Sequence, residues 1–167
     1  MMHDKLRALI AQLRLHGMAE ALDAELARAE REAIAAPELL YRLLGQEAAS
    51  RRERSLAYRL GQAHLPWRWS LDSFPFDRQP GVSKAQIQTL AGLDFLRRAD
   101  NVLLIGKPGT GKTGLGIGLL REACLNGYRG RFYNAQVLFD ELYASLADRT
   151  TTRLLGQLSR MQPLLID

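Results

Sequence analysis

The chain has 167 residues, of which 47% are hydrophobic and 25% are charged, as in ordinary globular proteins. Its longest apolar run covers residues 102–105, whereas a helix that crosses a bilayer needs about 20 apolar residues, so we expect no membrane-spanning segment. The formal net charge of +5 permits a polyanionic partner without requiring one.

The N-terminal segment and the cysteine content indicate the compartment. Charged residues are scattered among the leucines of residues 1–17, unlike the uninterrupted apolar core of a secretory signal peptide. Cys124 is the single cysteine of the sequence and cannot form an internal disulfide. We therefore expect a cytoplasmic protein.

Residues 1–63 are predicted to form an N-terminal helical region. Leucines recur every few residues through positions 3–33, with Arg and Glu between them, which predicts an amphipathic helix. Pro37 suits the first turn of a second helix that continues to about residue 62. We expect the two helices to form a hairpin that buries their leucines against each other.

A linker is predicted over residues 64–82. Prolines and aromatic residues are dense between positions 66 and 81, which disfavours regular structure. We expect this linker to fold onto the following domain, at residues 83–167. That domain begins with a helix from about Ser83, a good N-cap, to Arg98.

Arginines and aromatic residues are interleaved from the second helix into the linker. They are Arg51, Arg52, Arg54, Tyr58, Arg59, Trp67, Arg68, Trp69 and Arg78. This pattern can contact phosphates and stack on bases. It is also typical of a solvated helix face followed by a packed aromatic linker, so both interpretations stay open.

Strands and helices alternate in the domain at residues 83–167. The predicted elements are a strand at 101–105, a helix at 114–125, a strand at 131–134, helices at 135–147 and 152–161, and a strand at 163–167. Strands separated by helices of this length imply a parallel sheet with covered faces, which is an α/β fold.

The turn after the first predicted strand matches G-x-x-x-x-G-K-[ST] at every fixed position. Its residues are Gly106, Lys107, Pro108, Gly109, Thr110, Gly111, Lys112 and Thr113. Glycines let backbone N–H groups approach phosphate oxygens, and the following helix N-terminus adds free N–H groups and a positive dipole end. Lys112 supplies a full positive charge, and the Thr113 hydroxyl is a hard oxygen ligand for Mg²⁺. The motif predicts a site for a purine nucleoside triphosphate, with ATP and Mg²⁺ as the expected ligands.

A second metal-binding candidate is Asp167, which follows four residues of apolar strand. A phosphate-binding loop needs a carboxylate at the end of a neighbouring strand to hold the hydration shell of the metal. We therefore predict that Asp167 is the Walker B aspartate and that it acts together with Thr113.

The remaining candidates predict structural roles. His3, His16 and His64 are far apart in the sequence and fit no metal-ligand spacing. Cys124 is expected at a buried packing position on the helix after the loop.

The chain resembles, over nearly its whole length, the IstB-type transposition helper ATPases, which are AAA+ proteins related to the DnaC helicase loaders. The matching motifs, besides the phosphate-binding loop, are Leu-x-x-His-Gly-Met-Ala at 13–19, Glu47 with Arg52, Phe-Pro-Phe-Asp at 74–77 with Gln-Pro at 79–80, Asn-Val-Leu-Leu-Ile-Gly at 101–106, Leu-Phe-Asp-Glu-Leu at 138–142 and Leu-Leu-Ile-Asp at 164–167.

The resemblance implies an AAA+-type P-loop NTPase sheet, incomplete at the C-terminus and preceded by a helical region. It implies an ATP-binding helper of an insertion-sequence transposase that forms a homo-oligomer when full length, binds double-stranded DNA and presents it to its cognate transposase. Two alternatives stay open: a DnaC-like replicative helicase loader, and a non-catalytic fragment that binds DNA or a partner.

Two departures from the family pattern stand out. Gly114 follows the loop threonine where many relatives have histidine. The sequence also stops at Asp167, whereas the family continues with the glutamate that polarises the attacking water and with later motifs. We expect from this a fragment that binds nucleotide weakly and hydrolyses it poorly, with exposed apolar edges at residues 101–105 and 163–167.

Overall fold

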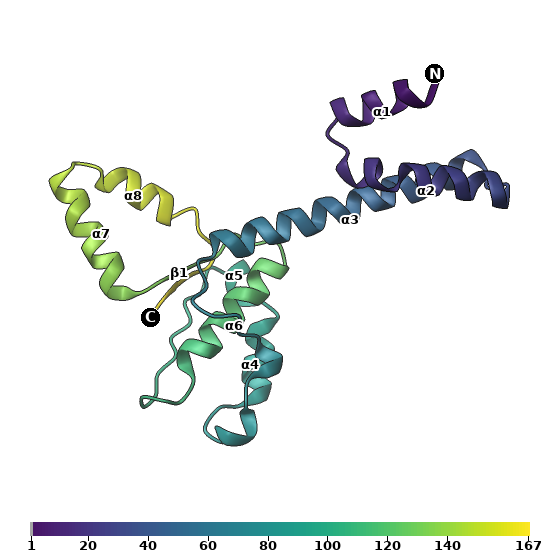
Figure 1. The fold of residues 1–167 in the computed structure, drawn as a ribbon. Coiled ribbons are helices and arrows are strands. Elements are labelled where there is room, and N and C mark those ends of the chain that lie inside the picture. The colour runs from purple at the N-terminus through teal and green to yellow at the C-terminus, as the bar shows by residue number, and fades with distance from the viewer. Residues whose placement is uncertain (1) are drawn as a thin grey trace. The chain divides into compact units, whose positions relative to one another are not determined.

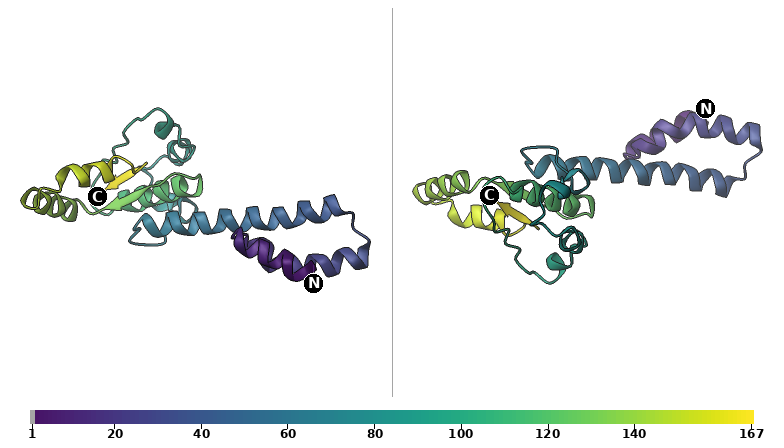
Figure 2. Two further views of the ribbon diagram at one scale, coloured as in Figure 1. Left: turned by 90° about the horizontal axis from the view of Figure 1, so that it is seen from above. Right: turned by 90° about the horizontal axis from the view of Figure 1, so that it is seen from below.

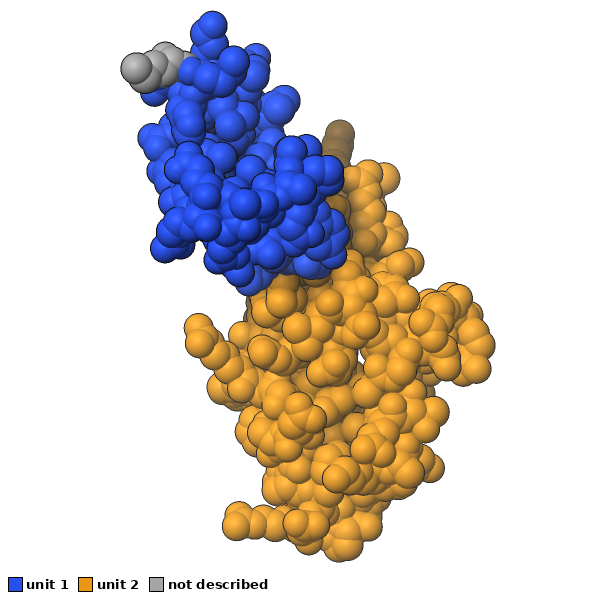
Figure 3. Space-filling model, turned by 90° about the vertical axis from the view of Figure 1, so that its right-hand side faces the viewer, with its two compact units in different colours: residues 1–55 blue, residues 56–167 orange. Residues whose placement is uncertain are grey.

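A computed structural model describes residues 2–167. The chain divides into two compact units, Met1–Ser55 and Leu56–Asp167 (Figure 3). The division falls within one long helix, Ala36–Gln62. The predicted domain limits at residues 63 and 82 stay predictions.

The first unit is entirely helical. It contains α1 (Met2–Gln12), α2 (His16–Glu32) and most of α3 (Ala36–Gln62), with α2 and α3 antiparallel as predicted (Figure 1). Its core cluster is Ile10, Met18, Leu22 and Leu43. The expected burial of the leucines is only partly correct, because many of them are exposed: Leu6, Leu9, Leu13, Leu40 and Leu44.

The prediction of one helix over residues 3–33 was wrong, because the chain turns between α1 and α2. Arg14 adopts a left-handed backbone with φ of 55°, and the Leu15 N–H donates to Ile10 O at 3.0 Å, which closes the end of α1. Directly after the turn, α2 approaches α3 so closely that a methyl group on Gly17 would lie 2.7 Å from Gln46 O. The turn thus lets Ile10 of α1 reach the same core as Met18 of α2.

The second unit begins with the last turns of α3 and short helical turns in the predicted linker. These are the 3₁₀ turns η1 (Leu71–Ser73) and η2 (Phe76–Arg78). The prediction that this linker folds onto the following domain is confirmed, because Phe74 is buried in a cluster with Ile87 and Leu115.

The predicted helix over residues 83–98 is two helices, α4 (Lys84–Ala91) and α5 (Asp94–Arg97). Ser83 caps α4 as expected, since its side chain accepts from the Gln86 N–H at 3.3 Å. The helix is interrupted at Leu93, which has φ of 61° and a buried side chain. The gain from burying this leucine offsets the cost of its left-handed backbone.

Two parallel strands form the sheet of the second unit. β1 (Arg131–Tyr133) pairs with β2 (Leu164–Ile166), and α7 (Ala135–Ala147) and α8 (Thr151–Leu158) connect them (Figure 2). The predicted parallel pairing is confirmed. On the other edge of β1, the Phe132 N–H donates to Ala63 O at 2.8 Å, which ties the residue after α3 to the sheet.

The prediction of a strand at residues 101–105 was wrong. These residues carry no strand assignment, and the side chains of Leu103 and Ile105 are 82% and 91% exposed. A strand exists only when its backbone pairs with a neighbour, and the sheet described within residues 2–167 contains β1 and β2 alone. Residues 101–105 therefore have the composition of a strand, but no neighbouring strand pairs with their backbone.

Helix α6 (Lys112–Leu125) is the centre of the second unit. It is buried on nearly every side, and Ile117, Leu120 and Cys124 are almost inaccessible. Cys124 thus lies at the packing position predicted for it. No helix among residues 2–167 combines the length and apolar character that crossing a bilayer requires.

Candidate nucleotide site

The glycine-rich loop lies between the extended residues 101–105 and the start of α6. Gly109 and Gly111 have φ of 78° and 82°, in the left-handed region that favours glycine. These two positions turn the chain tightly enough for α6 to begin at Lys112, directly after the turn. The loop conformation thus depends on the residues that the motif prescribes.

The N-terminus of α6 has free hydrogen-bond donors. Its N-cap residue is Gly111, and no side chain caps the helix. The first turn of a helix has N–H groups without intrahelical acceptors, and the helix dipole makes this end positive. An uncapped N-terminus beside a glycine turn is suited to binding an anion such as phosphate.

Two side chains of the loop donate to one carbonyl. Lys112 Nζ and Thr110 Oγ1 each lie 2.9 Å from Lys107 O. The ammonium group of Lys112 is thereby folded over the loop, where its charge adds to that of the helix end. A phosphate could replace the carbonyl as the acceptor for Lys112, because a charged acceptor makes the stronger hydrogen bond.

Thr113 and Asp167 meet although 54 positions separate them in the sequence. The hydroxyl of Thr113 lies 2.9 Å from Oδ1 and 3.0 Å from Oδ2 of Asp167, and it donates to this carboxylate. The structure therefore brings together the two oxygen ligands that the sequence predicts for a metal ion.

The backbone of Asp167 is fixed by β1 and α7. Its N–H donates to Tyr133 O at 3.0 Å, and its carbonyl accepts from the Ala135 N–H at 2.7 Å. Asp167 follows β2 directly, so the parallel register of the sheet determines where its carboxylate lies. Hydroxyl and carboxylate oxygens are hard ligands of the kind that Mg²⁺ prefers, and the pair therefore fits this ion.

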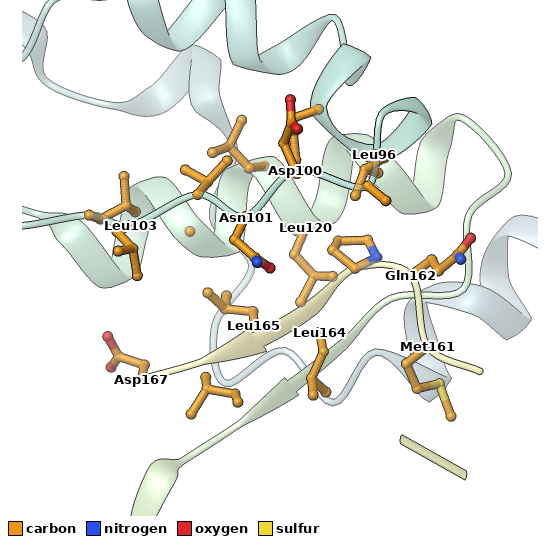
Figure 4. A pocket seen from close by; sticks show the side chains of 18 of the residues that line it. Leu96, Asp100, Asn101, Leu103, Leu120, Met161, Gln162, Leu164, Leu165 and Asp167 are labelled. Carbon is orange, nitrogen blue, oxygen red and sulfur yellow. The ribbon is translucent and has the colours of Figure 1, made fainter. Parts of the chain in front are cut away.

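A cavity of about 510 Å³ opens beside Asp167. Figure 4 shows Asn101 and Leu103 of the extended segment on one side, and Leu164 and Leu165 of β2 on another. Lys112 and Asp167 also line the cavity. Most of its lining residues are apolar, and the cavity lies between the extended segment and β2.

Sequence reasoning missed two residues that contact the loop from the predicted linker. The side-chain amide of Gln79 donates to Gly109 O at 3.4 Å, and the ring of Phe74 packs against Gly111. The local sequence pattern around Gln79 and Phe74 does not predict contacts with a loop that lies about 30 residues away. The spacing of the glycines in α6 could have indicated that some segment packs closely on that helix.

The other candidates take structural or surface positions. Burial raises the pKa of the Cys124 thiol, outweighing the opposing hydrogen bond from the Gly130 backbone, so the thiol stays protonated and unreactive at neutral pH. Part of the basic stretch is used internally, because Arg51 and Arg54 pair with Glu47 at 2.6 and 3.5 Å. Arg59 Nε donates to Cys124 O at 2.8 Å, at the C-terminal end of α6.

A glycine-rich loop at a helix N-terminus, beside an aspartate at the end of a parallel strand, defines the class of P-loop nucleotide-binding proteins. Within this class, the chain belongs to the family of IstB-like ATP-binding proteins, whose model matches residues 8–167. The resemblance noted in the sequence is therefore confirmed.

Several relatives are similar along most of the chain. A Pseudomonas aeruginosa protein, named as an ATP-binding protein of insertion sequence IS21, is 35% identical over 99% of this chain and 62% of its own length. A Geobacillus stearothermophilus protein, named for insertion sequence IS5376, is 35% identical over 84% of this chain and 56% of its own length. An IS21-like relative from Bacteroides fragilis is 34% identical over 93% of this chain and 78% of its own length. The chain thus spans less than two thirds of the first two relatives.

Proposed function

We propose that this chain binds ATP with Mg²⁺ through residues 106–113 and serves as the nucleotide-dependent part of a transposition helper protein. The carrying observation is the hydrogen bond between Thr113 and Asp167, next to an uncapped N-terminus of α6. The phosphates would lie on the N–H groups of the loop and of α6, with the ammonium of Lys112 as their counter-charge. The names of the relatives support ATP as the nucleotide.

Thr113 and Asp167 would hold the metal. Mg²⁺ bound there would neutralise charge on the phosphates. The role of the protein is to hold two hard oxygen ligands in place near the start of α6. Thr113 supplies its hydroxyl from α6, while Asp167 orients that hydroxyl and accepts from it.

We further propose that the second unit contacts double-stranded DNA through exposed residues near its start. Tyr58 and Trp67 are 62% and 59% exposed, and Arg68 beside Trp67 is exposed as well. An exposed arginine can bind phosphate, and an exposed aromatic ring can contact sugars or bases. Trp69 is different, because its indole packs against Gly114 and cannot serve the same purpose.

The insertion-sequence names of the relatives favour a transposase over a replicative helicase as the further partner.

The test of nucleotide binding compares two lysines of the same loop. Titration of a fluorescent ATP analogue with Mg²⁺ is expected to give saturable binding, weakened about 30-fold or more in Lys112→Ala, which removes the counter-charge. Lys107→Ala is the matched control, because Lys107 takes part in the loop contacts through its backbone carbonyl, which alanine keeps. The affinity of this variant for the ATP analogue should stay within about threefold of the wild type. Equal losses in both variants, or none in either, would contradict the proposed site.

The same titrations with duplex DNA test the second proposal. Trp67→Ala and Arg68→Ala should weaken DNA binding and leave the affinity for the ATP analogue unchanged. If ATP strengthens DNA binding in the wild type, the strengthening should be lost in Lys112→Ala. DNA binding that ignores both nucleotide and Lys112→Ala would instead support a non-catalytic DNA-binding role.

A further inference from the structure

Three glycines of the loop and of α6 lie on one face, at positions 111, 114 and 118. Spacings of three and four residues place side chains on the same face of a helix. Each of these glycines is in close contact with a residue from the segment before α4. Phe74 lies against Gly111, Trp69 against Gly114 and Leu71 against Gly118.

At two of these glycines a methyl group would overlap the neighbouring side chain unless that side chain moved. A methyl group at Gly111 would lie 2.6 Å from Cε2 of Phe74, and one at Gly118 would lie 2.5 Å from Cδ2 of Leu71. At Gly114 the nearest atom, Cε2 of the Trp69 indole, would be 3.2 Å away. Residues 69–74 therefore pack directly on the backbone of the helix that begins at the phosphate-binding loop.

The opposite side of α6 is held in the same way by the sheet. A methyl group at Gly116 would lie 2.9 Å from Cδ1 of Leu165, which belongs to β2. The helix is thus fixed between residues 69–74 and β2, and it cannot shift or rotate without losing contact on one side. Because β2 also leads to Asp167, the two sides together determine how far Thr113 lies from this aspartate.

We propose that Trp69, Leu71 and Phe74 are positioning residues for nucleotide binding, which hold the start of α6 and the loop in the geometry that receives phosphate. This inference rests on the proposed function of the loop. Phe74 has the most direct effect, because its ring contacts Gly111, the left-handed N-cap of α6. A misplacement of about 1 Å can slow an enzyme reaction roughly a hundredfold, which shows how strongly function depends on the position of such groups. The N–H groups at the start of α6 must likewise be held in place to receive a phosphate.

The test is a compensating pair of substitutions, Gly118→Ala and Leu71→Ala. Gly118 lies outside the loop motif, and alanine is the better helix former, so any loss must come from the clash with Leu71. We expect Gly118→Ala to weaken binding of the fluorescent ATP analogue with Mg²⁺ about tenfold. Adding Leu71→Ala should restore the affinity to within about threefold of the Leu71→Ala single variant, since the space is reopened.

Two controls separate positioning from general stability. Gly156→Ala places the same substitution in α8, where the added methyl group would meet no neighbouring side chain or segment within 4 Å. This variant should leave the affinity for the ATP analogue unchanged. Ile87→Ala removes a buried side chain from the cluster that contains Phe74, and it should lower the melting temperature with less than twofold effect on affinity. If Gly118→Ala does not fold, Leu71→Ala alone decides, because it removes atoms without a clash and should weaken binding more than Ile87→Ala does.

The outcomes distinguish this inference from the proposed function. Absence of binding by folded wild type would overturn the proposed nucleotide site and the inference with it. Wild type that binds, with a folded Gly118→Ala that binds equally well, would overturn the inference alone. The inference would also be overturned by a double variant that binds more than about threefold more weakly than Leu71→Ala. Equal affinity losses in Leu71→Ala and Ile87→Ala would overturn it as well.

Discussion

The hydroxyl of Thr113 and the carboxylate of Asp167 meet at the start of α6, where the phosphate-binding loop ends. Each residue is ordinary by itself: one starts a helix, and the other ends the described chain after a three-residue strand. Their hydrogen bond arises because α6 lies against β2 and because the parallel register fixes the end of that strand. The carboxylate thus orients the hydroxyl before any ligand binds.

Removing this orientation should affect binding only when the metal is present. We expect Asp167→Asn to weaken the affinity for the fluorescent ATP analogue roughly tenfold in Mg²⁺, because it removes a charge that would hold the metal and orient Thr113. In excess EDTA the two proteins should differ by less than about twofold. Thr113→Val should behave like Asp167→Asn, whereas Thr113→Ser keeps the hydroxyl and should resemble the wild type. Equal losses with and without metal would argue against a metal site.

At this scale the sequence predicted the motif residues and the distant aspartate, because both follow strict local patterns. It did not predict the contacts of Gln79 or Phe74 with the loop. These contacts depend on the path of residues 69–82 over the domain, and local composition does not determine that path. The nucleotide-binding role of the loop stays a prediction until it is measured.

Among the elements, α2 is stabilised at its start by a residue of α3. Its N-cap position is Leu15, whose side chain cannot accept a hydrogen bond. Glu47 of α3 supplies the missing acceptor, since its Oε2 lies 2.8 Å from the Gly17 N and 3.3 Å from the Met18 N. Its other oxygen pairs with Arg51 at 2.6 Å. A buried carboxylate thus joins the two helices and caps one of them.

This arrangement predicts a dependence of stability on pH. The hydrogen bond from Arg51, and the smaller ones from the backbone of Met18 and Gly17, lower the pKa of Glu47 below its ordinary value of about 4.5, against the opposing effect of desolvation. Because the folded pKa lies below the unfolded one, this stabilisation is complete above about pH 4.5 and is lost as the pH falls through the folded pKa. Glu47→Gln lacks the titrating group, so its free energy of unfolding should fall less steeply in that range.

Urea unfolding followed by circular dichroism between about pH 3 and pH 7 measures this difference. The other carboxylates titrate in both proteins, so the wild-type curve minus the variant curve isolates Glu47. Parallel curves would mean that Glu47 does not stabilise the folded state through its charge.

Prediction of the elements succeeded where side-chain period and caps agreed, as for α3, α7 and the parallel strands. It failed at Arg14 and Leu93, where a non-glycine residue takes a left-handed backbone inside an apolar helical pattern. Such residues are rare, and each one here lets a side chain reach a core. The gain comes from tertiary packing, which a periodic pattern cannot report.

For the molecule as a whole, the largest departure from prediction is the unpaired segment at residues 101–105. Leu103 and Ile105 are exposed, as expected for a sheet edge without a neighbour, and Leu103 lines the cavity. Leu104, between them, is half-buried against the core cluster that contains Phe74. Exposed apolar residues beside a free strand edge are a common cause of self-association.

Replacing these side chains should therefore change association more than stability. We expect the double variant Leu103→Thr and Ile105→Thr to lower light scattering at high protein concentration. Its free energy of unfolding should change by less than about 1 kcal/mol, because the side chains are 82% and 91% exposed. Leu120→Thr is the control, since Leu120 is 1% exposed and its replacement should cost about 3 kcal/mol. A double variant as unstable as Leu120→Thr would show that the segment packs into the core.

The glycines of α6 also have a consequence for the order of assembly during synthesis. A glycine costs a helix about 1 kcal/mol relative to alanine, and α6 contains three of them, at positions 114, 116 and 118. An isolated helix of this length is marginal even without glycine, so α6 should become helical only when its neighbours dock on it. One of those neighbours is β2, whose residues leave the ribosome more than 40 positions after Thr113. A nascent chain that already displays the whole loop motif would thus have no formed helix end to offer a phosphate until that strand has been made.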